Sequence, residues 1–250
     1  MSRVREARRG GPVMALLLLL PPALACSCLL DPPVVMPANG SVVPDRPVFH
    51  VFADAWLGPE DPPSVVQLFD RDGQPVPLVA VMLARGVSAV KPSQKLALDT
   101  DYQLVVWPPA GTFMPAPTSV RVHTSSATPP PPPPPSLNGG PTELHVGVSP
   151  CGSGGTAVFP ISTGPSRLVG VWKGKGDDGI DYDSAPAIWA LSEEHSLRIS
   201  WGVCSVGPSP GPGGKIGVRV MDAYGQWSPP LELKVAATPG APRRGVEAPW

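Results

Sequence analysis

The stretch Lys95-Leu96-Ala97-Leu98-Asp99-Thr100-Asp101-Tyr102-Gln103-Leu104-Val105-Val106-Trp107 decides how the first half of this chain folds. Apolar side chains keep a two-residue spacing on either side of its polar centre, at Leu96, Leu98, Tyr102, Leu104 and Val106. Side chains at that spacing share one face of an extended chain. The stretch therefore predicts a strand with one face in a core, and it places Leu98 on that face together with Leu96.

Tyr102 follows Asp-Thr-Asp at the entry to this strand. A tyrosine there can bury its ring while its hydroxyl bonds back to a nearby backbone carbonyl, which is the tyrosine corner of Greek-key sandwiches. The spacing of Leu96, Thr100, Tyr102 and Leu104 resembles the L-x-P-x-T-x-Y-x-V run of fibronectin type III and related immunoglobulin-like domains, with Leu98 in place of the proline.

Composition favours an all-β protein with room for about two domains of ~100 residues. The chain has 250 residues, of which 38 are Pro and 27 are Gly. Proline lacks the amide hydrogen and clashes in a helix interior, so short strands with many turns are expected. A formal net charge of -1 provides no global field to attract nucleic acid or an anionic membrane, and no nucleic-acid partner is expected.

The first 25 residues have the order of a secretory signal peptide. Four arginines precede the apolar run Val13 to Leu20, and the small residues Ala23 and Ala25 follow it. The apolar run is shorter than the ~20 residues of a membrane-spanning helix. The chain is therefore expected to be exported, to an extracellular, periplasmic or outer-membrane-anchored location.

Two forms of processing stay open at this site. Ala23-Leu24-Ala25 suits ordinary cleavage before Cys26. A cysteine directly after such a core also resembles a bacterial lipobox, in which Cys26 would carry lipid and provide the chain's only membrane attachment. Lipidation of Cys26 would leave Cys28 as an odd thiol.

Residues 31–126 are expected to form one β-sandwich. The run at 48–53 is apolar on both faces, which is typical of a central strand. Strands are expected at 34–36, 48–53, 65–69, 76–83, 87–90, 96–107 and 118–124.

Three motifs in this segment resemble bacterial immunoglobulin-like domains of secreted and surface proteins. They are Pro-x-Asn-Gly at 37–40, Phe-Asp-Arg-Asp-Gly at 69–73 and Leu-x-x-x-Thr-x-Tyr at 96–102. The resemblance implies an immunoglobulin-like architecture. Such domains act as spacers, stalks and binding modules alike.

Seven consecutive prolines, Pro129 to Pro135, lie within a Pro- and Gly-rich linker at 127–140. They favour a polyproline II spacer of roughly 22 Å. A second immunoglobulin- or fibronectin-like sandwich is expected at 141–237, followed by a disordered tail at 238–250. The run from Lys215 to Ser228 resembles the penultimate strand and turn of fibronectin-type modules.

Cys151 and Cys204 both lie in the second segment and are expected to form a disulfide. Exported compartments favour such bridges. Closing a loop of this length is worth ~4 kcal/mol on the chain-entropy model.

The sequence contains only weak matches to catalytic and metal-binding motifs. Cys151-Gly152-Ser153-Gly154-Gly155 resembles the run around the nucleophile of trypsin-like proteases, but the aspartate before the serine is missing, and a turn explains the run better. The four histidines have no metal-ligand spacing. No catalytic residue, no cofactor and no zinc site is expected, and a hydrolase is only a remote alternative.

Acidic residues are densest at Asp177, Asp178, Asp181 and Asp183, which are weak candidates for calcium ligands. The loop lacks the spaced pattern of an EF-hand, so a solvated loop is the preferred interpretation. Six tryptophans can supply either two cores or a sugar-stacking platform, at positions 56, 107, 172, 189, 201 and 227. The leading hypothesis is an exported, non-enzymatic structural or adhesive surface protein. The alternative is a carbohydrate- or protein-binding accessory module, and the partner in either case is an unidentified protein or glycan at the cell surface.

Overall fold

The computed structural model describes residues 32–52, 65–84, 86–107, 117–139, 142–149, 152–174, 179–193, 195–201 and 214–235. The regular elements in these ranges are strands. No helix long and apolar enough to cross a membrane occurs in the part of the chain that the structure describes.

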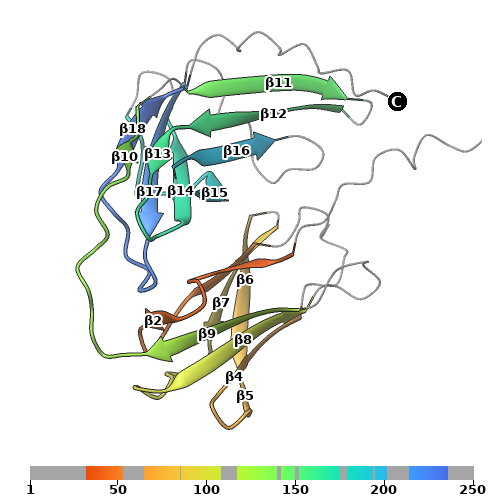
Figure 1. Ribbon diagram of the computed structural model, residues 1–250, viewed down its shortest axis with the longest axis vertical. Coiled ribbons are helices and arrows are strands. Elements are labelled where there is room, and N and C mark those ends of the chain that lie inside the picture. Colours follow the sequence, from red (N-terminus) through yellow and green to blue (C-terminus); the bar gives the residue numbers. More distant parts are fainter. Residues whose placement is uncertain are drawn as a thin grey trace, which may run out of the picture.

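The first nine strands form two sheets that enclose one core (Figure 1). The strands are β1 (Val34–Met36), β2 (Ser41–Val43), β3 (Phe49–Phe52), β4 (Val65–Phe69), β5 (Pro75–Val76), β6 (Leu78–Ala84), β7 (Val87–Pro92), β8 (Asp101–Trp107) and β9 (Thr118–Thr124). One sheet has the order β1-β3-β7-β6 and the other β2-β9-β8-β4-β5. In chain order these sheets correspond to strands ABED and GFC of an immunoglobulin domain, with β2 added beside G and β5 beside C. We call this unit the first sandwich.

The remaining strands form the second sandwich. They are β10 (Ser136–Leu137), β11 (Glu143–Ser149), β12 (Gly152–Phe159), β13 (Ile161–Ser162), β14 (Leu168–Lys173), β15 (Ile188–Leu191), β16 (Leu197–Trp201), β17 (Lys215–Met221) and β18 (Leu231–Lys234). The three-stranded sheet β11-β12-β16 faces the four-stranded sheet β15-β14-β17-β18, and β10 pairs with β13. Each sheet takes its strands from one side of the polyproline run, so the predicted all-β fold of two immunoglobulin-like sandwiches is confirmed.

The tyrosine corner predicted at Tyr102 is present. The ring is 6% exposed, and its hydroxyl oxygen accepts a hydrogen bond from the Ala97 amide at 3.0 Å. The backbone partner is thus an amide and not the predicted carbonyl. Leu96, at 5% exposed, also lies in the core. The predicted core position of Leu98 is wrong, because Leu98 is 46% exposed. Asp99 adopts a φ of 51°, so the chain turns between Leu96 and Tyr102 and the two-residue alternation is interrupted.

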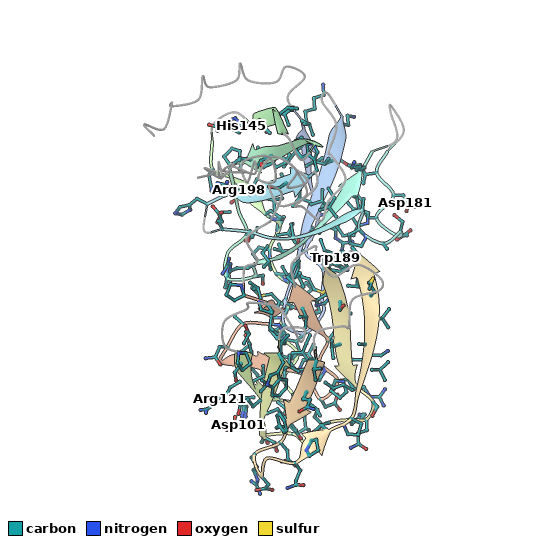
Figure 2. The ribbon with its side chains drawn as sticks, turned by 90° about the vertical axis from the view of Figure 1, so that its right-hand side faces the viewer. Asp101, Arg121, His145, Asp181, Trp189 and Arg198 are labelled. Carbon is teal, nitrogen blue, oxygen red and sulfur yellow. The ribbon has the colours of Figure 1, made fainter. Side chains whose placement is uncertain are left out.

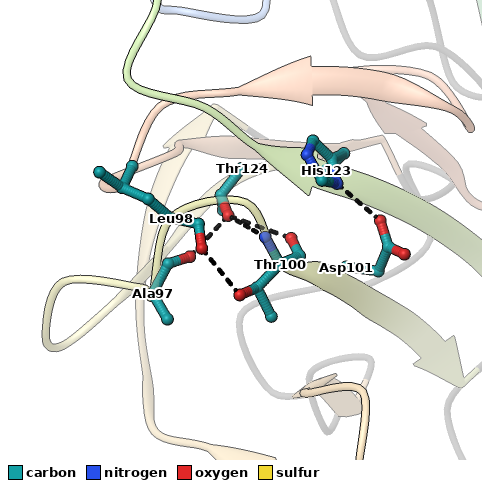
Figure 3. A network of polar contacts seen from close by, with 6 residues as sticks. All are labelled: Ala97, Leu98, Thr100, Asp101, His123 and Thr124. Atoms are coloured by element: carbon teal, nitrogen blue, oxygen red, sulfur yellow. Dashed lines mark hydrogen bonds and ion pairs between the residues drawn. The ribbon is translucent and has the colours of Figure 1, made fainter.

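Thr124 ties the end of β9 to this same turn (Figure 3). Its buried hydroxyl lies 2.6 Å from the Ala97 carbonyl oxygen and 3.0 Å from that of Thr100, and it accepts the Thr100 amide at 3.1 Å. Beside it, His123 pairs with Asp101 at 2.9 Å on the exposed face of the sheet. The turn before β8 is thus fixed by side chains as well as by the tyrosine corner.

The turn expected at 151–155 is wrong for the described residues of that run, because Gly152 to Gly155 belong to β12 and pair with β11. Gly155 serves close packing rather than a reversal of the chain. A Cβ at Gly155 would overlap the ring of Trp201 and the His145 carbonyl oxygen. Trp201, on the neighbouring strand β16, packs at the edge of the second core.

Candidate functional site: an aromatic junction between the sandwiches

Side chains of β14 and β17 point alternately into the second core and to the outer face of their sheet. Val169, Val171, Val218 and Val220 are fully buried in the second core. The residues that alternate with them, Gly170, Trp172, Gly217 and Arg219, therefore lie on the opposite face. This outer face is where the aromatic side chains of the second sandwich gather.

Four aromatic residues form a continuous cluster on this face. The Trp172 ring contacts Trp227 edge to face, with centroids 5.1 Å apart, and lies 5.6 Å from the ring of Tyr182. Trp189, from β15, lies 5.6 Å from Trp227. We call Trp172, Tyr182, Trp189, Trp227 and Arg219 the aromatic cluster.

The guanidinium group of Arg219 makes cation–π contacts with three of these rings. The guanidinium carbon lies 5.7 Å from the Trp227 centroid, 5.8 Å from that of Trp172 and 5.9 Å from that of Tyr182. Its Nε also donates to the Ser228 carbonyl at 2.7 Å, which holds the side chain across the sheet. Each cation–π contact of this kind is worth about 0.5–1 kcal/mol where it is exposed to solvent, and more where it is shielded.

Two glycines create the space that the rings occupy. A Cβ at Gly170 would lie 2.7 Å from Trp227 and 2.9 Å from Trp172. A Cβ at Gly217 would overlap the hydroxyl of Tyr182. The cluster is therefore seated directly on the backbone of β14 and β17.

One polar group of the cluster has a hydrogen-bond partner and another has none among the described residues. The Trp172 indole donates to the Ser184 carbonyl at 2.8 Å. The Tyr182 hydroxyl is shielded from solvent and has no hydrogen-bond partner among the described residues. Desolvation raises the pKa of Tyr182, and the negative charge of Glu232 raises it further, while Arg219 opposes the shift.

Trp189 connects the cluster to the first sandwich. Its ring stacks on His50 of β3, with centroids 5.1 Å apart and an angle of 30° between the rings. Figure 2 shows Trp189 where the two lobes meet. His50 is only 4% exposed, and this desolvation lowers its pKa from 6.5 to about 4. His50 is therefore neutral near pH 7.

A shallow crevice of about 280 Å³ lies beside this stack. Its walls come from both sandwiches and include His50, Arg167 and Asp222. Gln226, in the turn after β17, donates to the Pro129 carbonyl at 2.9 Å and so ties the start of the polyproline run to the second sandwich. Ala223, from the same turn, packs against the core of the first sandwich.

The structure brings together three of the six tryptophans singled out from the sequence, Trp172, Trp189 and Trp227. Trp107 instead packs edge to face on Phe69 at 6.4 Å within the first sandwich, and Trp56 lies outside the described residues. Sequence reasoning missed His50, Tyr182 and Arg219 as members of the site. Glycine alternating with valine in β14 and β17 was the available signal.

The calcium candidates are only partly described. Asp181 and Asp183 are exposed, and the Asp181 carboxylate accepts the Asp183 amide at 3.0 Å, which stabilises a local turn. Asp177 and Asp178 lie outside the described residues, as do Cys26, Cys28, Cys151 and Cys204. Within the described ranges, no three His, Cys, Asp or Glu side chains converge in a way that could hold a metal ion.

No protein-family model and no curated protein matches the chain. Among solved structures it is similar to the N-terminal Ig1-2 module of the Drosophila receptor protein tyrosine phosphatase DLAR, at 18% identity over 82% of this chain and 99% of that one, with a TM-score of 0.27. A structure of tandem Ig repeats of Dlar matches at 17% identity, covering 82% of this chain and 97% of that one, with a TM-score of 0.26. Dimeric latent PorU from Porphyromonas gingivalis matches at 16% identity over 83% of this chain and 20% of that one, with a TM-score of 0.29. The strand order and the tyrosine corner of the chain itself define an all-β protein of immunoglobulin-like sandwiches.

Proposed function

We propose that this chain is an exported, non-enzymatic structural or adhesive protein that works as a tandem of two sandwiches at the cell surface or outside the cell. The observation that supports this most is the aromatic stack that runs from His50 through Trp189 and Trp227 to Trp172. In this stack, Trp172, Trp189 and Trp227 pack against one another, and Trp189 also contacts the first sandwich. A fixed angle between modules suits a protein that positions its ends relative to each other.

The same stack argues against an open sugar platform as the main role. Trp172 is 3% exposed, so its faces are not available to a ligand. Trp189 and Trp227 are half-buried, and each has at least one ring neighbour. The part of their surface that stays exposed keeps a carbohydrate- or protein-binding accessory module as the second candidate, because half-exposed indole rings stack on apolar faces of ligands.

The test begins with the protein recovered from its natural location. Loss of residues 1–25 in its intact mass supports export, and a further gain from acyl chains assigns the lipid anchor to Cys26. The unprocessed N-terminus in the mature pool contradicts both statements. The same material is then applied to a glycan array, to whole cells and to a broad panel of hydrolase substrates.

Each outcome of that test separates the candidates. Attachment to cells or proteins without glycan binding supports the adhesive role. Glycan binding that is lost in Trp227→Ala and kept in Trp107→Ala supports the accessory module, since Trp107 lies in the first sandwich against Phe69. Turnover that disappears in Ser153→Ala would overturn the non-enzymatic proposal.

A further inference from the structure

Strand β6 has an unusual composition for the edge of a sheet. It is the outer strand of the sheet β1-β3-β7-β6, and its seven residues, Leu-Val-Ala-Val-Met-Leu-Ala, carry no charge and no proline. Four of its large side chains are exposed: Val79 is 44%, Val81 52%, Met82 66% and Leu83 37% exposed. A long, apolar, uncharged edge is a template for pairing with another strand.

Other outer strands in the described sheets are protected from such pairing. Strands β1, β2, β5, β10, β13 and β15 have only two to four residues. The edge strands β11, β16 and β18 carry charged side chains, which are Glu143 on β11, Arg198 on β16, and Glu232 and Lys234 on β18. Short length and charge are the usual devices against edge pairing. Only β6, among these described edges, has neither of them.

A row of paired residues links β6 to His50, where the second sandwich contacts the first. On the outer face of the sheet, Met36 pairs with His50, His50 with Ala89, and Ala89 with Val81, so these four residues form one row across it. The second sandwich covers this row at His50 through Trp189. At the β6 end the row remains open at Val81, and Val79 lies beside it on the same face.

The sequence of β6 matches itself in the antiparallel direction. The regular part of the strand, before the register shift between Met82 and Ala84, is Leu-Val-Ala-Val-Met. Antiparallel pairing about Ala80 sets Val79 of one copy against Val81 of the other, and Leu78 against Met82. Every facing pair is then apolar, and the small Ala80 lies at the centre, where the two strands cross the twofold axis.

We propose that β6 is a self-association edge, through which two copies of this chain pair antiparallel about Ala80 and join their four-stranded sheets into one continuous sheet. A second copy fits this edge better than a foreign strand does, because the match extends over the whole regular part of β6 and has no charge to complement. Closed twofold pairing also removes the exposed edge from both chains at once. Self-pairing requires neither export nor a ligand, so its test is independent of the proposed function.

Sedimentation equilibrium of the purified protein tests this proposal. Wild type is expected to dimerise, and Val81→Lys to raise the dissociation constant at least about fivefold, because a lysine is forced into an apolar row. Val146→Lys is the matched control, since Val146 is 50% exposed on the edge strand β11, and it is expected to leave dimerisation unchanged. Circular dichroism establishes that each variant is folded.

A double variant tests the register itself. In Val79→Glu combined with Val81→Lys, each glutamate faces a lysine of the other copy, so about two- to fivefold of the lost affinity should return. Ala80→Cys should in addition give a disulfide-linked dimer under oxidation, because facing Cα atoms of antiparallel strands lie within disulfide range. A monomeric wild type, a Val81→Lys variant that dimerises normally, or a double variant no better than Val81→Lys overturns the proposal. A monomer that captures an extended apolar peptide at β6 also overturns it, in favour of a foreign strand.

Discussion

Gly217 and Gly170 show how single residues determine the candidate site. Both alternate with buried valines, and both leave open the volume that aromatic rings fill on the outer face of the sheet. Neither has a positive φ. Both residues are therefore glycine because aromatic side chains approach the backbone closely there, and not because the backbone adopts a special conformation.

Replacement of Gly217 by alanine should destabilise the second sandwich. The added Cβ would overlap the Tyr182 hydroxyl, so the ring must leave its place between Trp172 and Arg219. We expect a loss of about 1–3 kcal/mol in the free energy of unfolding, the usual cost of overpacking. Urea denaturation followed by tryptophan fluorescence measures it.

Gly179→Ala is the matched control for this substitution, because nothing lies within 4 Å of its Cβ position. It should change the free energy of unfolding by less than about 0.5 kcal/mol. Equal effects of the two alanines would contradict the close-packing role of Gly217.

Residue-scale prediction from the sequence succeeded where the cause was local. The tyrosine corner depends on a few residues upstream of Tyr102, and it was found. The predicted position of Leu98 is wrong because the positive φ of Asp99 breaks the alternation, and the apolar spacing does not indicate this positive φ. His50 was read as part of a central strand, but its burial depends on Trp189, which is far away in the sequence.

At the scale of elements, strands with clear alternation were predictable and short ones were not. Strands β4, β9 and β17 lie where the sequence placed them. Strand β15 was missed, because its four residues are too few to establish a period. The first half of β12 is a strand and not the predicted turn, because glycine favours turns in general and its role here, close packing, depends on distant residues.

The bridge expected between Cys151 and Cys204 stays a prediction. Both cysteines lie outside the described residues. Non-reducing peptide mapping should recover the linked pair from oxidised protein.

Cys151→Ser should then lower the stability of the second sandwich by about 2–4 kcal/mol and leave the first sandwich unchanged. A Cys28→Ser variant controls for general effects of removing a thiol. Free thiols at both positions 151 and 204 in oxidised protein would disprove the bridge.

At the scale of the whole molecule, the stack of His50 on Trp189 and the packing of Ala223 on the first core join the described parts of the two sandwiches. The hydrogen bond from Gln226 to Pro129 ties the linker to the second sandwich. Contacts between modules are expected to open before either core unfolds. We expect the protonation state of His50 to control this opening.

Acidification should open the junction. The pKa of His50 is about 4 in the closed state and near 6.5 once the ring is exposed to water, so the open state binds more protons between these values. The closed state is therefore fully favoured above about pH 6.5, and it loses stability as the pH falls toward 4, by at most about 3 kcal/mol. Arg167 and Asp222 line the same crevice as His50.

Small-angle X-ray scattering between pH 7 and pH 4 measures this opening as an increase in the radius of gyration while circular dichroism stays constant. His50→Phe keeps a ring against Trp189 but cannot be protonated, so its junction should remain closed across the range. His145→Gln removes an exposed histidine of β11 that pairs only with Glu143 among the described residues, and it should behave like wild type. A radius of gyration that is independent of pH in wild type, or that increases equally in His50→Phe, would show that His50 does not control the junction.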